Sequence, residues 1–215
     1  MKKTRQLMAI MLCIVAGMSI CSCLGSDDNN KVTTLQPLTQ EEKLAQLREM
    51  AGFYNGWIYF INDTTSRTDS IPVSWTVTAP DSTITINNFP VQVLANGITD
   101  RGVRKVLFNS GTRELTGSIR PYVNEHNKEN YYTFLLTPTN YSLAFTTEHE
   151  GAQHQVQVNF TYQLAAFTTD YYPVNYFANG EYIKSNFVGF LLVKEVKFDS
   201  ATFTTGRANY IFGSK

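Results

Sequence analysis

Strict alternation of apolar and polar side chains over residues 155–164 constrains this chain more than any other feature. The apolar members are Val156, Val158, Phe160, Tyr162 and Leu164. Amide and hydroxyl side chains occupy the positions between them. Because successive residues of a strand point to opposite faces, this pattern buries one face and leaves the other in water. Antiparallel sheets tolerate one wet face, whereas parallel sheets are covered on both, so the sequence predicts a mainly β, antiparallel fold.

Other segments alternate in the same way or are rich in β-forming residues. They are residues 73–79, 83–86, 141–145, 187–198 and 201–212. The polar residues 148–153 predict the loop of a hairpin that joins segments 141–145 and 155–164. Asn179-Gly180 predicts a two-residue hairpin turn, because both residues readily adopt positive φ.

A short helix is predicted ahead of the first strands. Thr39 is a candidate N-cap, and Glu42 stands three positions later, as in a capping box. Gly52 ends the run. The apolar residues that recur at helical spacing are Leu44, Leu47 and Met50.

Residues 91–111 lose the alternation and predict a helical insert. Thr99 or Asp100 is the candidate N-cap, and Gly111 stands where a glycine commonly follows a helix. The apolar stripe of this segment is Val103, Val106 and Leu107. The sequence therefore predicts one mainly β domain of about nine or ten strands with two helices. Alternation alone leaves open whether the strands form a single antiparallel β-barrel or a β-sandwich.

The first residues have the layout of a cleavable secretory signal. Lys2, Lys3 and Arg5 precede an apolar run over residues 7–20, and the chain turns polar after Cys23. An uncleaved transmembrane helix is the alternative. The apolar run is shorter than the roughly 20 residues that a bilayer-spanning helix needs, which disfavours that alternative.

Ile20-Cys21-Ser22-Cys23 resembles the lipobox of bacterial lipoproteins. The small residue Ser22 precedes Cys23, whereas the bulky Ile20 precedes Cys21, so Cys23 is the expected lipidation site. The resemblance implies a diacylglycerol on the Cys23 sulfur, cleavage after Ser22 and acylation of the new amino terminus. Two or more acyl chains anchor a protein stably in a membrane.

The expected organisation is a lipoprotein signal peptide over residues 1–22, a lipidated flexible tether over 23–37 and the mainly β domain over 38–215. Ser26-Asp27-Asp28 resembles the acidic export signal of Bacteroidetes surface lipoproteins, and an ordinary solvated tether is the alternative. The lipobox resemblance implies a protein of the cell envelope that is lipid-anchored at the outer membrane. Display at the cell surface follows only from the export-signal interpretation of Ser26-Asp27-Asp28, so the face of the membrane stays open.

The charge balance bears on the partners of the chain. The sequence has 18 Lys and Arg against 18 Asp and Glu, and removal of the leader leaves 15 basic residues and a net charge of −3. A balance of this kind argues against nucleic acid as a partner. All three cysteines lie at or before Cys23, so the domain has no intramolecular disulfide and depends on burial for its stability.

The start of the domain carries a second resemblance. Gly52-Phe53-Tyr54-Asn55-Gly56-Trp57, after a short helix, is similar to the glycine and aromatic opening of calycin-type barrels, which include the lipocalins. The whole layout resembles uncharacterised families of Bacteroidetes lipoproteins with a calycin-like β-domain. This resemblance implies a barrel and brings no diagnostic active-site motif.

No recognised catalytic or cofactor motif is present in the sequence, so neither an enzymatic activity nor a cofactor is expected. His149 and His154 lie with Glu148 and Glu150 in the predicted hairpin loop. Imidazoles and carboxylates can hold a divalent cation, but a solvated turn is the preferred interpretation and no metal site is predicted. The two glutamates are also candidates, by adjacency alone, for paired-carboxylate chemistry.

Aromatic side chains gather among asparagines over residues 168–186. The candidate ligand-binding residues are Tyr171, Tyr172, Tyr176, Phe177 and Tyr182. Aromatic rings stack on the C–H faces of sugars, while neighbouring amides bond the sugar hydroxyls. Packing inside strands is the alternative, because aromatics are also favoured there. Trp57 and Trp75 are expected in the core.

The preferred functional hypothesis is a non-catalytic binding module, anchored to the envelope by lipid, for a glycan, a small ligand or a protein partner. A hydrolase with carboxylate chemistry is one alternative, and a structural or accessory subunit of a surface assembly is the other. A deep carboxylate-lined pocket would favour the hydrolase, and a large exposed apolar patch would favour the assembly.

Mass spectrometry of the native protein tests the predicted anchor. We expect a chain that begins at an acylated Cys23 and partitions with membranes. An unacylated, full-length species in the cytosol would contradict both the anchor and the location inferred from it.

Overall fold

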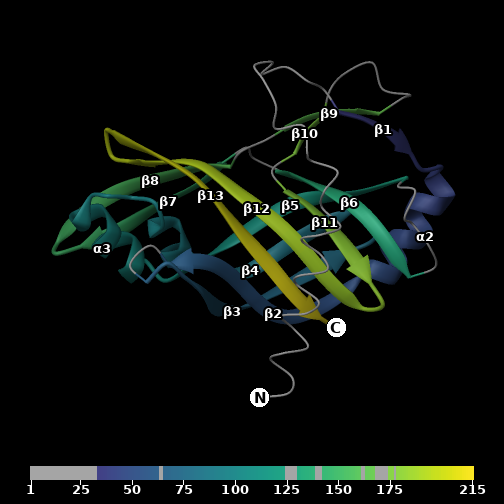
Figure 1. The fold of residues 1–215 in the computed structure, drawn as a ribbon, viewed down its shortest axis with the longest axis horizontal. Helices are drawn as coiled ribbons and strands as arrows, with labels where there is room; N and C mark the ends of the chain where they lie inside the picture. Colours follow the sequence, from purple (N-terminus) through teal and green to yellow (C-terminus); the bar gives the residue numbers. More distant parts are fainter. Residues whose placement is uncertain are drawn as a thin grey trace. The chain divides into compact units, whose positions relative to one another are not determined.

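Eight antiparallel strands form a closed barrel in the computed structural model of the chain (Figure 1). The structure describes residues 33–62, 65–123, 130–138, 142–160, 163–167, 174–176 and 178–215. Around the barrel the order is β5 (Thr112–Val123), β4 (Thr83–Pro90), β3 (Arg67–Thr78), β2 (Gly52–Asn62), β13 (Ala201–Ser214), β12 (Asn186–Phe198), β11 (Ala178–Ile183) and β6 (Tyr131–Pro138). β6 pairs with β5 and closes the ring.

The predicted fold class is therefore confirmed, and the open choice between barrel and sandwich is decided in favour of the barrel. Closure pairs each of these eight strands with a neighbour on both sides, so none of them is an edge strand of an open sheet.

Five more strands extend the barrel. They are β1 (Thr33–Pro37), β7 (Ser142–His149), β8 (Ala152–Phe160), β9 (Gln163–Phe167) and β10 (Val174–Tyr176). The hairpin of β7 and β8 pairs with the second half of β12, after an irregularity between Val193 and Glu195. β1 pairs with β5 and runs parallel to β9. The last five residues of the expected tether thus belong to the sheet, because their backbone groups find partners on two strands.

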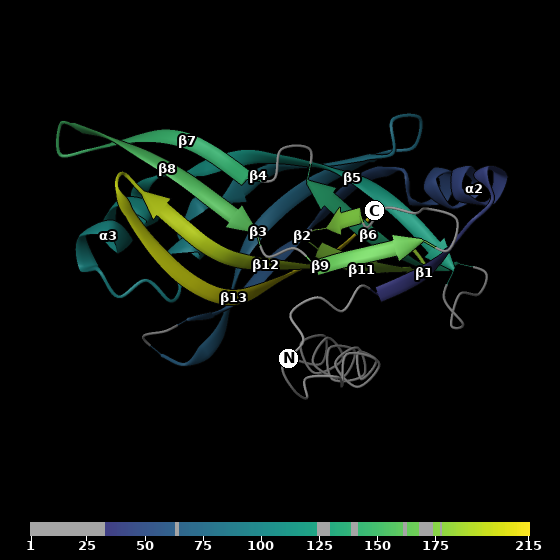
Figure 2. The same ribbon diagram turned by 90° about the horizontal axis from the view of Figure 1, so that it is seen from above.

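Among the described residues, two α-helices lie at opposite ends of the barrel (Figure 2). They are α2 (Gln40–Met50) and α3 (Arg101–Asn109), with a short 3₁₀ helix η2 (Val91–Ala95) ahead of α3. The predicted capping box is confirmed: the backbone N–H of Glu42 donates to the Thr39 hydroxyl, and the Glu42 carboxylate accepts from the Thr39 backbone N–H at 2.9 Å.

The carboxyl end of α2 is held by tyrosine hydroxyls of the barrel. Tyr54 donates to the carbonyl oxygen of Met50 at 2.5 Å, and Tyr182 donates to that of Glu49 at 3.2 Å. Tyr132 donates to the Glu49 carboxylate at 2.7 Å. Burial, with this hydrogen bond, raises the pKa of Tyr132 to about 12, so its hydroxyl stays a donor at neutral pH. The contacts of Tyr54 and Tyr182 satisfy carbonyl groups that a helix end leaves without an internal partner.

The predicted helical insert is also confirmed, with Asp100 as its N-cap. The backbone N–H of Val103 donates to the Asp100 carboxylate at 2.9 Å. The apolar stripe of Val103, Val106 and Leu107 is buried. η2 adds four more buried side chains, Val91, Val93, Leu94 and Ala95. The loss of alternation in this segment therefore reflects a helical cap that packs on the core.

Aromatic rings fill the barrel interior near α2. Tyr54, Trp75, Phe134 and Phe187 are each fully buried. The rings of Tyr54 and Trp75 stack with centroids 5.5 Å apart, and those of Phe134 and Phe187 stack at 4.8 Å. An eight-stranded barrel is just wide enough for its own side chains, and here large rings occupy that space.

Glycines on nearby strands make room for these rings. A Cβ added at Gly213 would lie 2.6 Å from Cη2 of Trp75, and one at Gly180 would lie 2.5 Å from Cζ of Phe134. Such separations are too short for real Cβ atoms. The lack of a side chain at Gly213 therefore leaves space for the ring of Trp75, and the lack of one at Gly180 leaves space for the ring of Phe134.

The prediction of a turn at Asn179-Gly180 is wrong. Both residues lie inside β11, and the turn between β11 and β12 is made by Lys184 and Ser185, whose φ values are 47° and 72°. The glycine is needed opposite Phe134 rather than in a turn. Both turn residues instead adopt the left-handed conformation that a tight hairpin requires.

The hairpin predicted before residue 164 is present but differs in two details. The expected loop 148–153 shortens to Glu150-Gly151, because His149 pairs with Ala152 and the ladder continues to the tip. The long alternating segment is divided: β8 ends at Phe160, and Gln163–Phe167 forms β9 beside β1.

Replacement of Gly213 by alanine tests the packing of the interior. The added methyl group would meet Trp75 and the backbone oxygen of Asn55, so we expect the free energy of unfolding to fall by about 1–3 kcal/mol in chemical denaturation. Gly102→Ala, on α3, is the control. Its added Cβ would lie 3.3 Å from one side-chain oxygen of Asp100, and alanine favours helices. Equal stability of the two variants would contradict this account.

Candidate functional site

The described part of the predicted aromatic cluster is used for packing. Tyr182 is buried, stacks on Tyr132 with ring centroids 5.9 Å apart and donates its hydroxyl to Glu49. Tyr176 lies in β10, where only the backbone is described. The other candidates, Tyr171, Tyr172 and Phe177, lie outside the described residues, as does Cys23.

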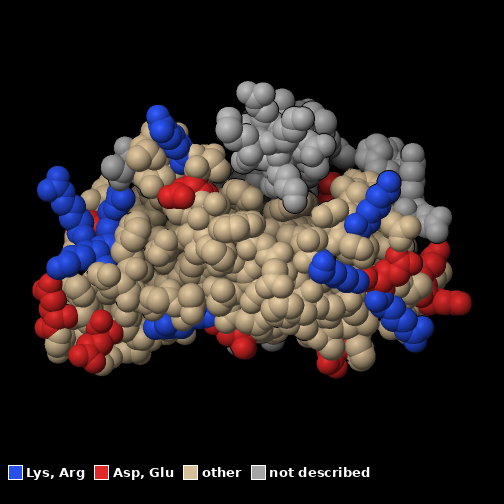
Figure 3. Space-filling model, turned by 90° about the horizontal axis from the view of Figure 1, so that it is seen from below, with Lys and Arg blue, Asp and Glu red and all other residues tan. Residues whose placement is uncertain are grey.

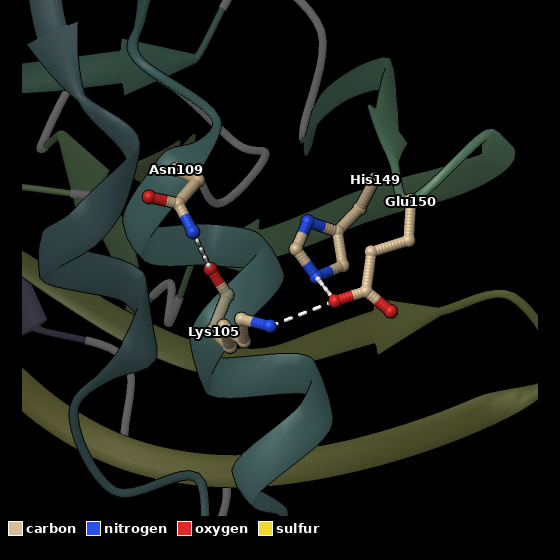
Figure 4. Close-up of polar contacts among 4 residues, drawn as sticks. All are labelled: Lys105, Asn109, His149 and Glu150. Carbon is tan, nitrogen blue, oxygen red and sulfur yellow. Dashed lines mark hydrogen bonds and ion pairs between the residues drawn. The ribbon is translucent and has the colours of Figure 1, made fainter.

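The tip of the β7–β8 hairpin is tied to α3 rather than solvated on all sides. Glu150 accepts from Nζ of Lys105 at 2.7 Å, and Nε2 of His149 lies 3.3 Å from the same carboxylate oxygen (Figure 4). The hydrogen bond from Lys105 and the charges of Lys105 and His149 hold the pKa of Glu150 below its usual value. A carboxylate held ionised in this way is a poor general acid.

A second histidine joins the same hairpin to the turn between β12 and β13. His154 donates from Nδ1 to Asp199 at 2.9 Å, and the other carboxylate oxygen accepts from the backbone N–H of Gln155 at 2.9 Å. The ring of His154 also packs on Phe198. Among the described residues, no group of three or more His, Cys, Asp and Glu side chains is placed to hold a metal ion.

The barrel interior offers isolated polar atoms rather than a convergent set. Nε1 of Trp75 and Oδ1 of Asn209 are buried without a hydrogen-bond partner. Trp75 pairs with Tyr54 and therefore lies beside the start of β2. Asn209 precedes Tyr210, the partner of Tyr59, and therefore lies beside the residue of β2 that follows Tyr59. Along β2 these levels are about 20 Å apart at the usual strand rise. The two atoms therefore do not form one ligand site.

The outer face of β2 carries an exposed apolar row, and it corrects the expectation that Trp57 is a core residue. Phe53, Trp57 and Ile61 are 52%, 44% and 45% exposed, whereas Trp75 is fully buried as predicted. The three exposed residues are four positions apart, so they share one face of the strand. Exposed large apolar side chains that gather on one face are typical of interaction surfaces.

A shallow hollow of about 350 Å³ lies beside Trp57. Its lining includes Asn55, Pro72, Ser74 and Asn88. The side-chain oxygen Oδ1 of Asn88 accepts from the backbone N–H and the hydroxyl of Ser74, at 2.7 and 3.1 Å. Ser74 lies one position outside the β3–β4 ladder, which ends with Trp75 and Ile86, and Asn88 lies where the ladder between β4 and β5 is irregular. Within the described structure nothing accepts a hydrogen bond from the Asn88 amide nitrogen, which keeps two hydrogens to donate.

The neighbouring strand supplies hydroxyl groups to the same face. The outward residues of β2 are Phe53, Asn55, Trp57, Tyr59 and Ile61. In the same order, their partners on β3 are Thr76, Ser74, Pro72, Ser70 and Thr68. None of these ten residues is charged. The view from below shows Lys, Arg, Asp and Glu side chains mainly toward the two ends, with uncharged surface between them (Figure 3). We call the outward residues of these two strands the β2–β3 face.

The β2–β3 face combines apolar contact surface with neutral hydrogen-bonding groups. It offers aromatic and aliphatic side chains for contact, with amides and hydroxyls for hydrogen bonds. It has no carboxylate, imidazole or amine that would act as a general acid or base.

The pattern of apolar and polar residues did not predict this face, because β2 carries apolar side chains on both of its sides. Tyr54, Ile58 and Phe60 point inward, while Phe53 and Trp57 point outward, so alternation gives no contrast between the two sides. Two features of the sequence could have indicated the face. One is Asn55 between the outward Phe53 and Trp57, and the other is the set of hydroxyl residues on β3, Thr68, Ser70, Ser74 and Thr76.

No helix within the described residues has both the length and the apolar character required to cross a bilayer.

The contact between His154 and Asp199 predicts a pH dependence of stability. Hydrogen bonds from His154 and Gln155 lower the pKa of Asp199 below its unfolded value of about 3.9. The stabilisation is therefore present above that value and is lost as the pH falls through the folded pKa. Asp199→Asn, which tolerates the positive φ of 49°, should lower the urea midpoint near neutral pH, and the difference should disappear toward about pH 2.

Asp81→Asn, at an exposed turn residue, is the matched control and should leave the midpoint unchanged. A difference for Asp199→Asn that stays constant throughout the acid range would mean that the ionised carboxylate does not stabilise the hairpin.

Comparison with known proteins places the chain in a family. A family model described as a domain of unknown function, DUF4840, matches residues 49–186, which include β2, β3 and the whole β2–β3 face. No curated protein and no solved structure matches the chain. The family match covers more than half of the sequence, and the chain belongs to the DUF4840 family.

Proposed function

We propose that this protein is a non-catalytic binding module of the bacterial cell envelope that binds carbohydrate on the β2–β3 face. The observation that carries the proposal is Trp57, 44% exposed beside a hollow lined by amide and hydroxyl groups. An exposed indole offers a flat ring for the C–H face of a sugar and an N–H donor at its edge.

The surroundings of Trp57 fit the two sides of a sugar ring. Across the strands Trp57 is flanked by Pro72 on β3 and Phe212 on β13, which form an apolar row. The next row of the same face is polar, with Asn55 between Ser74 and Ser214. A ring stacked on the apolar row would have its hydroxyls beside the polar one.

The amino-terminal sequence supports the proposed location. The lipobox-like Ile20-Cys21-Ser22-Cys23 and the basic and apolar leader before it resemble those of exported lipoproteins. Lipidation at Cys23 would hold the barrel at the outer membrane and, with the acidic serine-containing segment after it, at the cell surface. A module in this place meets envelope or environmental glycans.

The carboxylates give the hydrolase alternative little support. Glu150 is held by Lys105 and His149, and Glu148 accepts from the side chain of Gln153 at 3.3 Å. Both lie on the β7–β8 hairpin and neither is among the residues that line the hollow beside Trp57.

Substitution of Trp57 tests the proposed function. The full-length protein is screened against an array of neutral and anionic glycans, and the ligands found are titrated by calorimetry. Trp57→Ala should weaken binding about tenfold, as expected for loss of one aromatic stacking contact. Trp57→Tyr, which keeps a flat ring, should retain most of the affinity.

Phe108→Ala is the matched control, because Phe108 is an equally exposed aromatic residue on α3, away from the face. It should leave binding unchanged. An array without any ligand, or equal affinity for Trp57→Ala and the unmodified protein, would refute carbohydrate binding at this face.

A further inference from the structure

We infer that the β2–β3 face takes an internal stretch of a neutral polysaccharide, laid along β2, rather than a single sugar or a chain end. The inference rests on the proposed function and adds the class of ligand and its direction. It follows from how the outward residues of β2 are ordered, from what faces them on β3 and from the absence of charge.

The outward side of β2 alternates between apolar contact and hydrogen-bonding groups. From one end to the other the residues are Phe53, Asn55, Trp57, Tyr59 and Ile61. Successive members are about 7 Å apart, so the apolar ones repeat about every 13 Å and the row is about 26 Å long. Such a row is longer than one or two sugar rings, and its repeat offers apolar contact and hydrogen bonding in turn.

The exposed apolar residues continue on both sides of the hollow. Phe53 and Ile61 are each at least as exposed as Trp57, at 52% and 45% against 44%. A site for a chain end needs a wall that stops the ligand on one side. The near-equal exposure of all three positions provides surface in both directions instead, which suits the interior of a long chain.

The facing strand gives the row a hydroxyl border. Phe53 pairs with Thr76, Asn55 with Ser74, Tyr59 with Ser70 and Ile61 with Thr68, so each of these levels has a hydroxyl beside it. Neutral sugars bond well to hydroxyls and amides. An acidic polysaccharide would find no Lys or Arg on this face to pair with its carboxylates, and burial of an unpaired charge is costly. The border therefore favours an uncharged chain.

Affinity as a function of ligand length tests the inference. Calorimetric titrations of the full-length protein use neutral gluco-, xylo- and manno-oligosaccharides from disaccharide to octasaccharide, with oligogalacturonates as the anionic counterpart. We expect affinity for the series that binds to rise at least tenfold between the disaccharide and the longer members. Oligogalacturonates should bind at least tenfold more weakly than neutral chains of equal length.

Two variants separate the ends of the row from its centre. Phe53→Ala and Ile61→Ala should each weaken the longest ligand about threefold to tenfold while leaving the disaccharide unchanged, and Trp57→Ala should weaken both. Val123→Ala, at an exposed residue on β5, is the control and should change neither. Circular dichroism melts check that each variant is folded.

The outcomes distinguish this inference from the proposed function. Equal affinity for short and long ligands, with Trp57→Ala still harmful, would overturn the extended site and leave carbohydrate binding intact. Tighter binding of oligogalacturonates than of neutral chains would overturn the preference for uncharged ligands. If Phe53→Ala and Ile61→Ala reduce binding to phosphatidylcholine vesicles and no oligosaccharide binds, the face is a membrane contact and both proposals fail.

Discussion

The packing of Trp75 against Gly213 is the constraint on which the rest of the barrel depends. The indole occupies the space where a side chain at Gly213 would stand, and Gly213 in turn pairs with Gly56 on β2. A slip of one residue would move every side chain of a strand to the opposite face. The match between ring and glycine therefore sets the register of three strands and decides that Trp57 points outward.

A filled interior has a consequence for function. Tyr54, Trp75, Phe134 and Phe187 take the space near α2 that a ligand in a barrel of this size would need. α2 packs at one end, where tyrosine hydroxyls hold its carbonyl groups, and η2 and α3 pack at the other. The recognition that we propose therefore uses the outer surface, where the β2–β3 face combines exposed rings, amides and hydroxyls without charge.

Local interactions explain which parts of the fold were predictable. The capping box of Thr39 and Glu42 and the N-cap at Asp100 act within three residues, so the sequence shows both helices directly. The turn assigned to Asn179-Gly180 failed for the opposite reason. That glycine is required by the ring of Phe134, which lies far away in sequence, and no local pattern records such a contact.

By itself the sequence determined the mainly β class, the two helical segments and the alternation of buried and exposed positions along several strands, because these depend on residue spacing and on neighbouring backbone groups. Only the tertiary structure decided that the strands close into a barrel, that Tyr182 is a packing residue and that Trp57 is exposed. Closure and register are set by contacts between distant strands. When both faces of a strand are apolar, as in β2, the inward face is known only after its partners are in place.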